Sequence, residues 1–224
     1  AGPALMEMLS RGGKIMTYTI PSANVTAMSV SGDSLWICDW LKQEIYKLKV
    51  EKDGLVTKGT YVLSVMPAGI TETKDYLYTC DTWARKINKH VYDDKLSVIA
   101  SFPAPGSAPS ALCYDGKTLW SSDRETKKIY RHDIKDPALP VLASFNSPCE
   151  RQIGLFFDGS YFWSVDGEKM MVYKHAKDMS VIERYNLSIA GKKMSGVLIT
   201  KKHVWIAFEG DNRIVRYPRN ALLN

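Results

Sequence analysis

Short apolar runs alternate with clusters of turn residues along the chain, and they recur at a fixed spacing. One run reads DSLWICDW at 33–40, and its counterparts read DYLYTCDT at 75–82, KTLWSSDR at 117–124, SYFWSVDG at 160–167 and KHVWIAFE at 202–209. The aromatic residue of the run returns after 42, 42, 43 and 42 residues, as Trp36, Tyr78, Trp120, Trp163 and Trp205. A repeat of about 40–45 residues is typical of a β-propeller blade or a solenoid unit.

Three further positions repeat in step with the aromatic residue. Nine residues before it stands a small column: Ala27, Gly69, Ala111, Gly154 and Gly196. Nine residues after it stands a β-branched column: Ile45, Ile87, Ile129, Val172 and Ile214. Eleven residues after it stands a basic column: Lys47, Lys89, Arg131, Lys174 and Arg216. Chance does not align these columns in five units, so each unit is one structural repeat.

Each unit reads as short strands rich in Val, Ile, Tyr and Trp and bounded by turn residues. Four strands fit in a unit, as in a propeller blade. The fifth unit stops after its third strand, at Tyr217, whereas the chain begins with an unassigned strand at 14–20. Pairing the two closes the ring and removes two exposed sheet edges. The sequence therefore predicts an all-β fold: a five-bladed β-propeller of four-stranded antiparallel blades, whose N-terminal strand completes the last blade.

This pattern also sets the expected domain limits. One domain covers 13–224, and residues 1–12 are interpreted as a linker or the remnant of a larger chain. The expected blades cover about 25–65, 67–106, 108–148, 151–190 and 193–218 together with 14–20. We therefore expect a monomer or a part of a larger chain.

Composition narrows the class of partner. The formal net charge is +6 and the pI is about 9.0, but the basic column spreads part of this charge around the ring. Nucleic acid is therefore not the expected partner. No apolar run of about 18 residues occurs, so no membrane span is expected.

The four cysteines leave alternatives open. They are Cys38, Cys80, Cys113 and Cys149. Burial of all four as small hydrophobic residues is the favoured interpretation. One disulfide is the first alternative. Metal ligation is the least favoured, because no pair has zinc spacing.

An acidic column follows the aromatic one. It comprises Asp39, Asp81, Asp123 and Asp166, with Glu209 one place late in the fifth unit. A ring of carboxylates at the channel mouth is able to hold calcium or another divalent cation. Alternatively, each Asp accepts backbone N–H bonds and fixes its own loop. Repetition in every unit favours the loop-fixing role, so no metal ligand is assigned.

The histidines do not form a catalytic or metal site in this pattern. His90, His132 and His175 share one column on the third strands, which lie too far from the axis to meet at one ion. No nucleophile elbow or Ser/His/Asp order occurs. We therefore assign these histidines to the core and name no catalytic residue.

Residues that break the repeat are the better candidates for a binding site. Trp40 and Trp83 follow the Asp in the first two units, and Arg85, Arg124 and Arg151 belong to loops on the same face. An exposed Trp often marks a ligand surface. These residues, together with Asp39, Asp81, Asp123 and Asp166, form the predicted site for a protein, peptide or glycan on the channel face.

The repeat also resembles a known group of propellers. The pattern DGxxLWxxDxxxxxIYRxD, clearest at 115–133, and EGDNRIVRYP at 209–218 resemble the NHL, YVTN and streptogramin-lyase-like repeats. The resemblance implies a propeller over about 14–220 and a periplasmic or secreted location. It favours a non-enzymatic binding module, with a metal-dependent hydrolase or lyase of the lactonase or streptogramin-lyase type as the alternative. The first unit, VTAMSVSGDSLWICDW, lacks the FTQG and ESTG elements of the five-bladed glutaminyl cyclotransferases.

Overall fold

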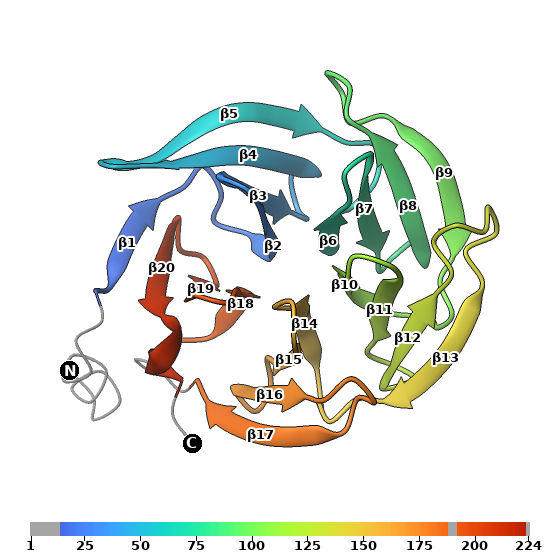
Figure 1. Cartoon of the computed structure of the whole chain (residues 1–224). Coiled ribbons are helices and arrows are strands. Elements are labelled where there is room, and N and C mark those ends of the chain that lie inside the picture. Colours follow the sequence, from blue (N-terminus) through green and yellow to red (C-terminus); the bar gives the residue numbers. More distant parts are fainter. Residues whose placement is uncertain (1–13, 188–191, 223–224) are drawn as a thin grey trace.

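The chain folds into a ring of five sheets around a central axis (Figure 1). The computed structural model describes residues 14–187 and 192–222, so the interpretation of residues 1–12 lies outside the described residues. Every sheet has four antiparallel strands. The predicted five-bladed β-propeller is confirmed.

The strands follow the repeat unit by unit. Blade 1 contains β2 (Val25–Ser31), β3 (Ser34–Asp39), β4 (Glu44–Glu51) and β5 (Gly54–Val62). Blade 2 contains β6 (Gly69–Glu72), β7 (Tyr76–Asp81), β8 (Lys86–Val91) and β9 (Val98–Pro103). Blade 3 contains β10 (Pro109–Tyr114), β11 (Leu119–Asp123), β12 (Lys128–His132) and β13 (Val141–Asn146). Blade 4 contains β14 (Gln152–Phe157), β15 (Phe162–Asp166), β16 (Met171–His175) and β17 (Val181–Asn186). Blade 5 contains β18 (Met194–Ile199), β19 (His203–Phe208), β20 (Arg213–Pro218) and β1 (Met16–Thr19), and η1 (Arg219–Ala221) follows β20.

The ring closes as the sequence predicts. Strand β1 pairs with β20 in an antiparallel register that runs from Met16 opposite Arg216 to Thr19 opposite Arg213. The ring of Tyr18 stacks on Trp205, with 5.7 Å between the ring centroids. The first strand of the chain therefore supplies the outer edge of the last blade, and Figure 1 shows β1 beside β20.

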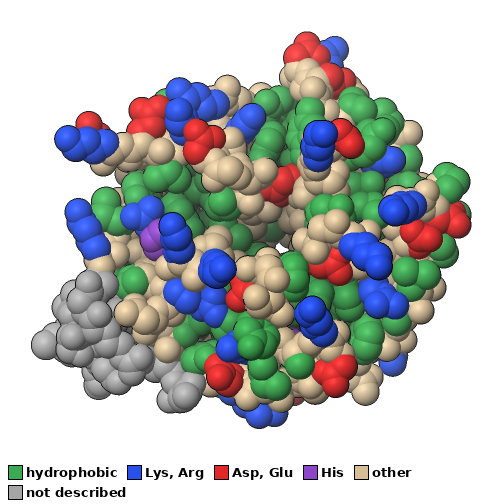
Figure 2. All heavy atoms as spheres, viewed as in Figure 1, with side chains coloured by type: hydrophobic (Ala, Val, Ile, Leu, Met, Phe, Trp, Pro, Cys, Tyr) green, Lys and Arg blue, Asp and Glu red, His purple; other side chains and the backbone are tan. Residues whose placement is uncertain are grey.

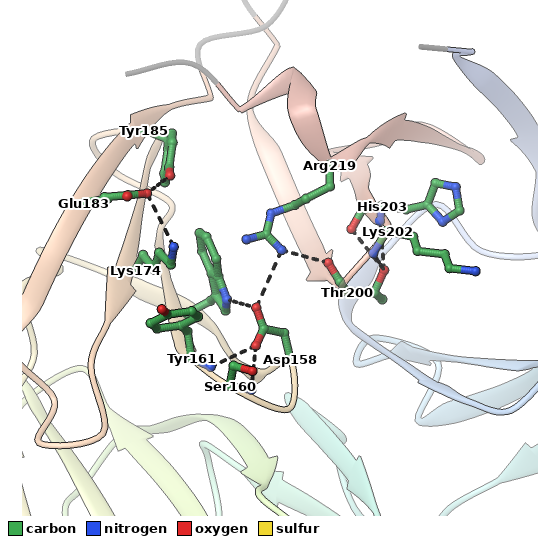
Figure 3. A network of polar contacts seen from close by, with 11 residues as sticks. Asp158, Ser160, Tyr161, Lys174, Glu183, Tyr185, Thr200, Lys202, His203 and Arg219 are labelled. Carbon is green, nitrogen blue, oxygen red and sulfur yellow. Dashed lines mark hydrogen bonds and ion pairs between the residues drawn. The ribbon is translucent and has the colours of Figure 1, made fainter.

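A second contact ties blade 5 to blade 4 (Figure 3). The Arg219 guanidinium lies 3.7 Å from the centroid of the Trp163 ring, and its Nη1 donates to the Thr200 carbonyl at 3.0 Å. It also lies 3.8 Å from Asp158 Oδ2, which accepts the indole N–H of Trp163. The short η1 segment thus fastens the end of β20 to the neighbouring blade.

The repeated columns build the core. All five residues of the β-branched column are fully buried, and each residue of the aromatic column is at most 4% exposed. The basic column lies directly across the strand pair from the aromatic column. Lys47 Nζ, for example, lies 5.3 Å from the Trp36 centroid, and the Arg216 guanidinium lies 5.4 Å from Trp205. These cations pack on aromatic faces, so a good part of the positive charge is structural.

The small column lines the axis. A Cβ on Gly69 would lie 3.0 Å from the Ala111 backbone, and one on Gly196 would lie 3.1 Å from Val25. The innermost strands β2, β6, β10, β14 and β18 approach each other this closely around the channel. Only small side chains fit there.

The histidine column is part of the core, as predicted. His132 Nε2 lies 2.8 Å from the Ser121 hydroxyl, and its Nδ1 lies 3.2 Å from the Leu139 carbonyl. His90 and His175 make the same two contacts in their own blades. Burial lowers the pKa of all three. The Nδ1 atom of each of these histidines faces a backbone carbonyl. No carboxylate therefore orients the imidazole as in a Ser–His–Asp triad.

The cysteines follow the favoured interpretation. Cys38, Cys80, Cys113 and Cys149 are all buried and unbridged, and burial raises the pKa of each thiol. In the part of the chain that is described, no helix is long and apolar enough to span a membrane.

Candidate functional site

The ring has two faces with different lining. We call the face built from the hairpin turns between the first and second strands of each blade the turn face. The opposite face, which we call the loop face, is built from the loops after Asp39, Asp81, Asp123 and Asp166 and from the connections between blades. Both faces open into the central channel.

A cavity of about 540 Å³ lies at the loop-face mouth of the channel. Trp40, Trp83, Arg124 and Arg151 all line it, so the structure brings together four residues that the sequence singled out. Arg85 is not in the lining; it is an exposed residue with φ of 58° on the rim. Four of the predicted site residues therefore meet in one cavity that blade 5 completes with Met194, Ser195 and Glu209, whereas Arg85 and the four Asp residues of the predicted site lie outside its lining.

The two tryptophans form the apolar side of this cavity. Trp83 is 75% exposed, whereas Trp40 is half-buried. Met66 and Met194 lie beside them in the lining. An exposed indole next to flexible thioethers suits contact with an apolar or flat group of a ligand.

The two arginines form the cationic side. Arg124 Nε donates to the Gln152 carbonyl at 3.3 Å, and Arg151 Nε lies 3.9 Å from Glu168 Oε2. Burial and the charge of Arg151 lower the pKa of Arg124. Arg151 Nη2 is buried and has no hydrogen-bond partner among the described residues, and the Ser195 hydroxyl in the same lining has none either. The cavity therefore has more donors than the protein satisfies.

The acidic column does not line this cavity. Asp166 is fully buried and accepts N–H bonds from Glu150, Arg151, Glu168 and Lys169 at 2.8–3.3 Å. The other three carboxylates make equivalent bonds to their own loop and to the preceding connection between blades. Each Asp thus holds two loops together. The sequence predicted that each Asp fixes its own loop, but it did not predict the contact with the connection between blades.

A glycine beside Asp123 offers a test of this clamp. A Cβ on Gly106 would lie 2.3 Å from Asp123 Cγ, and three backbone N–H groups hold that carboxylate in place. We expect Gly106→Ala to lower the free energy of unfolding by about 1–3 kcal/mol, as overpacking does. Urea unfolding measures the change. Gly59→Ala is the control, because the atoms nearest to its Cβ belong to the Tyr61 side chain and not to a clamping carboxylate; equal losses in both variants would contradict the clamp.

Several lining residues carried no signal in the sequence. Met66, Met194 and Ser195 belong to segments where the repeat allows many residue types. Glu209 also lines the cavity and is paired with Lys193 at 3.2 Å. Its displaced position in the repeat was visible, but its place in the wall was not.

The cavity has binding groups without a recognisable acid–base pair. Glu209 is the one carboxylate among the lining residues, and it is exposed. Nowhere in residues 14–187 and 192–222 do three His, Cys, Asp or Glu side chains come together as a metal site. The arrangement is able to pair with an anionic group and to pack against its apolar neighbour.

Comparison with known proteins places the fold. No protein-family model matches the chain, and no curated protein matches it in sequence. Virginiamycin B lyase from Staphylococcus aureus is similar in structure, with a TM-score of 0.61 at 14% identity over 92% of this chain and 99% of that one. Glutaminyl cyclase from Myxococcus xanthus has a TM-score of 0.73 at 11% identity over 95% of this chain and 97% of that one.

These similarities bear on the fold alone. The chain is a five-bladed β-propeller, and its fold is similar to that of the streptogramin B lyases, in agreement with the resemblance of its repeats. The structural neighbours are enzymes by name. At 11–17% identity they share a fold with this chain, and its function has to come from its own site.

Proposed function

We propose that this protein is a non-enzymatic binding module that holds an acidic peptide segment at the loop-face mouth of its channel. The observation that carries the proposal is that Arg124 and Arg151 line one cavity together with Trp40 and Trp83, and that Arg151 Nη2 has no hydrogen-bond partner among the described residues. Guanidinium groups bind carboxylates through paired, charge-assisted hydrogen bonds. Such bonds are stronger in a site partly screened from water.

The rest of the lining supports a peptide in particular. Met66, Met194 and the two indoles offer apolar surface for a side chain next to the carboxylate. Tryptophan and arginine are the residues that most often dominate binding energy at interfaces. The buried Asp column keeps their loops in place before the ligand arrives, which reduces the entropy lost on binding.

The test uses labelled peptides of alternating Glu and Phe, with Gln-for-Glu peptides as the neutral set and uronic acid oligosaccharides as a second acidic set. Fluorescence anisotropy measures binding. We expect the Glu peptides to bind at least tenfold more tightly than the Gln peptides, because only the carboxylates satisfy the arginines (about 1.4 kcal/mol for tenfold). Arg124→Gln and Trp83→Ala should each weaken binding about tenfold or more.

Arg85→Asn is the matched control, because Arg85 lies outside the cavity and Asn tolerates its positive φ. It should leave binding unchanged. Equal binding of the Glu and Gln peptides, or equal losses in Arg85→Asn and Arg124→Gln, would overturn the proposal. Binding of the uronic acids alone would also overturn the peptide assignment.

A further inference from the structure

The channel changes character between its two mouths. At the small column it narrows to a gap of about 10 Å³, lined by residues such as Ala27, Gly69 and Gly154. A gap of this size has room for about one water molecule. Beyond it, on the turn face, the channel widens again into a cavity of about 310 Å³. Figure 2 shows this face, with acidic and basic side chains mixed around the central opening.

One carboxylate breaks the symmetry of the turn-face cavity. Glu72 lies at the end of β6, six residues before the aromatic of its blade. The corresponding residues of the other blades are uncharged: Val30, Tyr114, Phe157 and Ile199. All five line the same cavity. A repeat built for packing alone does not require a carboxylate at this place.

The hydrogen bonds of Glu72 are incomplete. The Ser29 hydroxyl donates to its Oε2, whereas its Oε1 is buried and has no partner among the described residues. Burial raises the pKa of this carboxyl to about 7. Burying a carboxylate without a cation costs free energy. A positively charged partner beside Glu72 would therefore be stabilising.

The other charged groups of the lining do not supply that partner. Asp158 is held by Ser160, Tyr161 and Trp163, and Lys201 is exposed at the rim. No salt bridge to Glu72 occurs within the described part of the chain. The remaining wall combines aromatic and aliphatic side chains, such as Tyr114, Phe157 and Leu112, with the hydroxyl side chains of Ser31 and Thr71.

We propose that the turn-face cavity is a second binding site, for a small organic cation: a protonated or methylated amine carried on an apolar body. Glu72 Oε1 accepts from the ammonium or lies against it, and the aromatic wall packs on the apolar body. Ammonium groups bind favourably to aromatic faces, and more so when they are desolvated. A hard metal ion needs several oxygen ligands. Asp158 is already held by its own turn and by Trp163, so Glu72 is the carboxylate of this lining that has an unpaired oxygen, and the organic cation is the better fit.

The test compares phenethylammonium with its neutral analogue, phenethyl alcohol, by isothermal titration calorimetry at pH 8. We expect the amine to bind at least tenfold more tightly than the alcohol. Glu72→Gln has nearly the same shape and should remove that preference. Tyr114→Leu should weaken the amine several-fold, and it provides a second variant that keeps the carboxylate.

Glu209→Gln is the control, because it removes a carboxylate from the opposite mouth; it should leave amine binding unchanged. Equal binding of amine and alcohol, no binding of either, or a preference that survives Glu72→Gln would overturn the proposal. None of these measurements involves Arg124 or Arg151. The result therefore stands apart from the peptide assays of the loop face.

Discussion

Replacing Asp166 with Ala is expected to lower the free energy of unfolding by about 3–5 kcal/mol, because it leaves four backbone N–H groups of a buried clamp without their acceptor. Two of these groups belong to the loop after β15 and two to the connection before β14. Loss of the carboxylate therefore releases both loops at once. Asp166→Asn keeps one acceptor oxygen and should lose less than half as much. Urea unfolding with a shared m-value measures both changes.

Asp178→Ala is the matched control for this experiment. Asp178 is exposed and accepts bonds from Ser180 alone in the described turn. We expect its removal to leave the free energy of unfolding nearly unchanged. If Asp166→Ala and Asp178→Ala are equally stable, the acidic column does not hold the loops. The position of Arg151 next to the clamp means that Asp166→Ala should also weaken peptide binding at the loop face.

Glu72→Gln is expected to stabilise the fold at pH 8 and to have little effect near pH 4.5. The pKa of Glu72 rises from 4.5 to about 7 because of burial. Below pH 4.5 the carboxyl is neutral in both states. Between pH 4.5 and 7 the unfolded chain loses this proton while the folded chain keeps it, so the free energy of unfolding falls as pH rises. At 1.36 kcal/mol per pKa unit the full loss is on the order of 3 kcal/mol, and it is complete above pH 7.

The groups that interact with Glu72 do not account for this dependence of stability on pH. Tyr92 and Cys38 interact with its charge, but burial raises the pKa of both. Lys47 and Lys74 from the adjoining cavity are present in wild type and variant alike. Urea unfolding from pH 4.5 to 8.5 should show the variant gaining about 1–3 kcal/mol over wild type as pH rises. A difference that stays constant with pH would contradict the assignment, and Glu209→Gln should show no such trend.

The fold could be predicted from the sequence because the burial pattern repeats. The β-branched and aromatic columns fixed the number of blades, and the missing fourth strand after Tyr217 indicated the closure by β1. The boundaries in blade 1 were less accurate. The first blade was expected to extend to about residue 65, whereas its last strand, β5, is Gly54–Val62, because β4 and β5 form a long hairpin. That extension depends on a turn at Gly54 with φ of 149°, which is unique to this blade.

Site residues could be predicted from the sequence only where they departed from the repeat. Trp40, Trp83, Arg124 and Arg151 stood out for that reason, and all four line the loop-face cavity. Arg85 was predicted with them but is not in the lining, since loop position alone does not fix which side chains reach a cavity. The second contact of Asp81, Asp123 and Asp166 was hidden, because its donors are backbone N–H groups, which any residue type provides, and the hydroxyl of Ser22 that serves Asp39 does not recur in the other units.

Glu72, in contrast, departs from the repeat but was not predicted as a site residue. It is a charged residue in a column of uncharged ones, so the same criterion that found the tryptophans applied to it. The predicted site comprised loop residues, whereas Glu72 lies on an inner strand. Symmetry breaking inside the strands is as informative as in the loops when the strands line a channel.

The closure of the ring by β1 also has a mechanical consequence. The chain enters the described ring just before Met16 and leaves β20 at Pro218, and Met16 lies opposite Arg216. Tension applied through the two ends therefore acts on the same end of one antiparallel ladder. The hydrogen bonds of such a ladder lie across the strands, so they break in succession and do not share the load. The weakest direction of this ring under force is consequently its own seam, and blade 5 opens before any other blade is loaded.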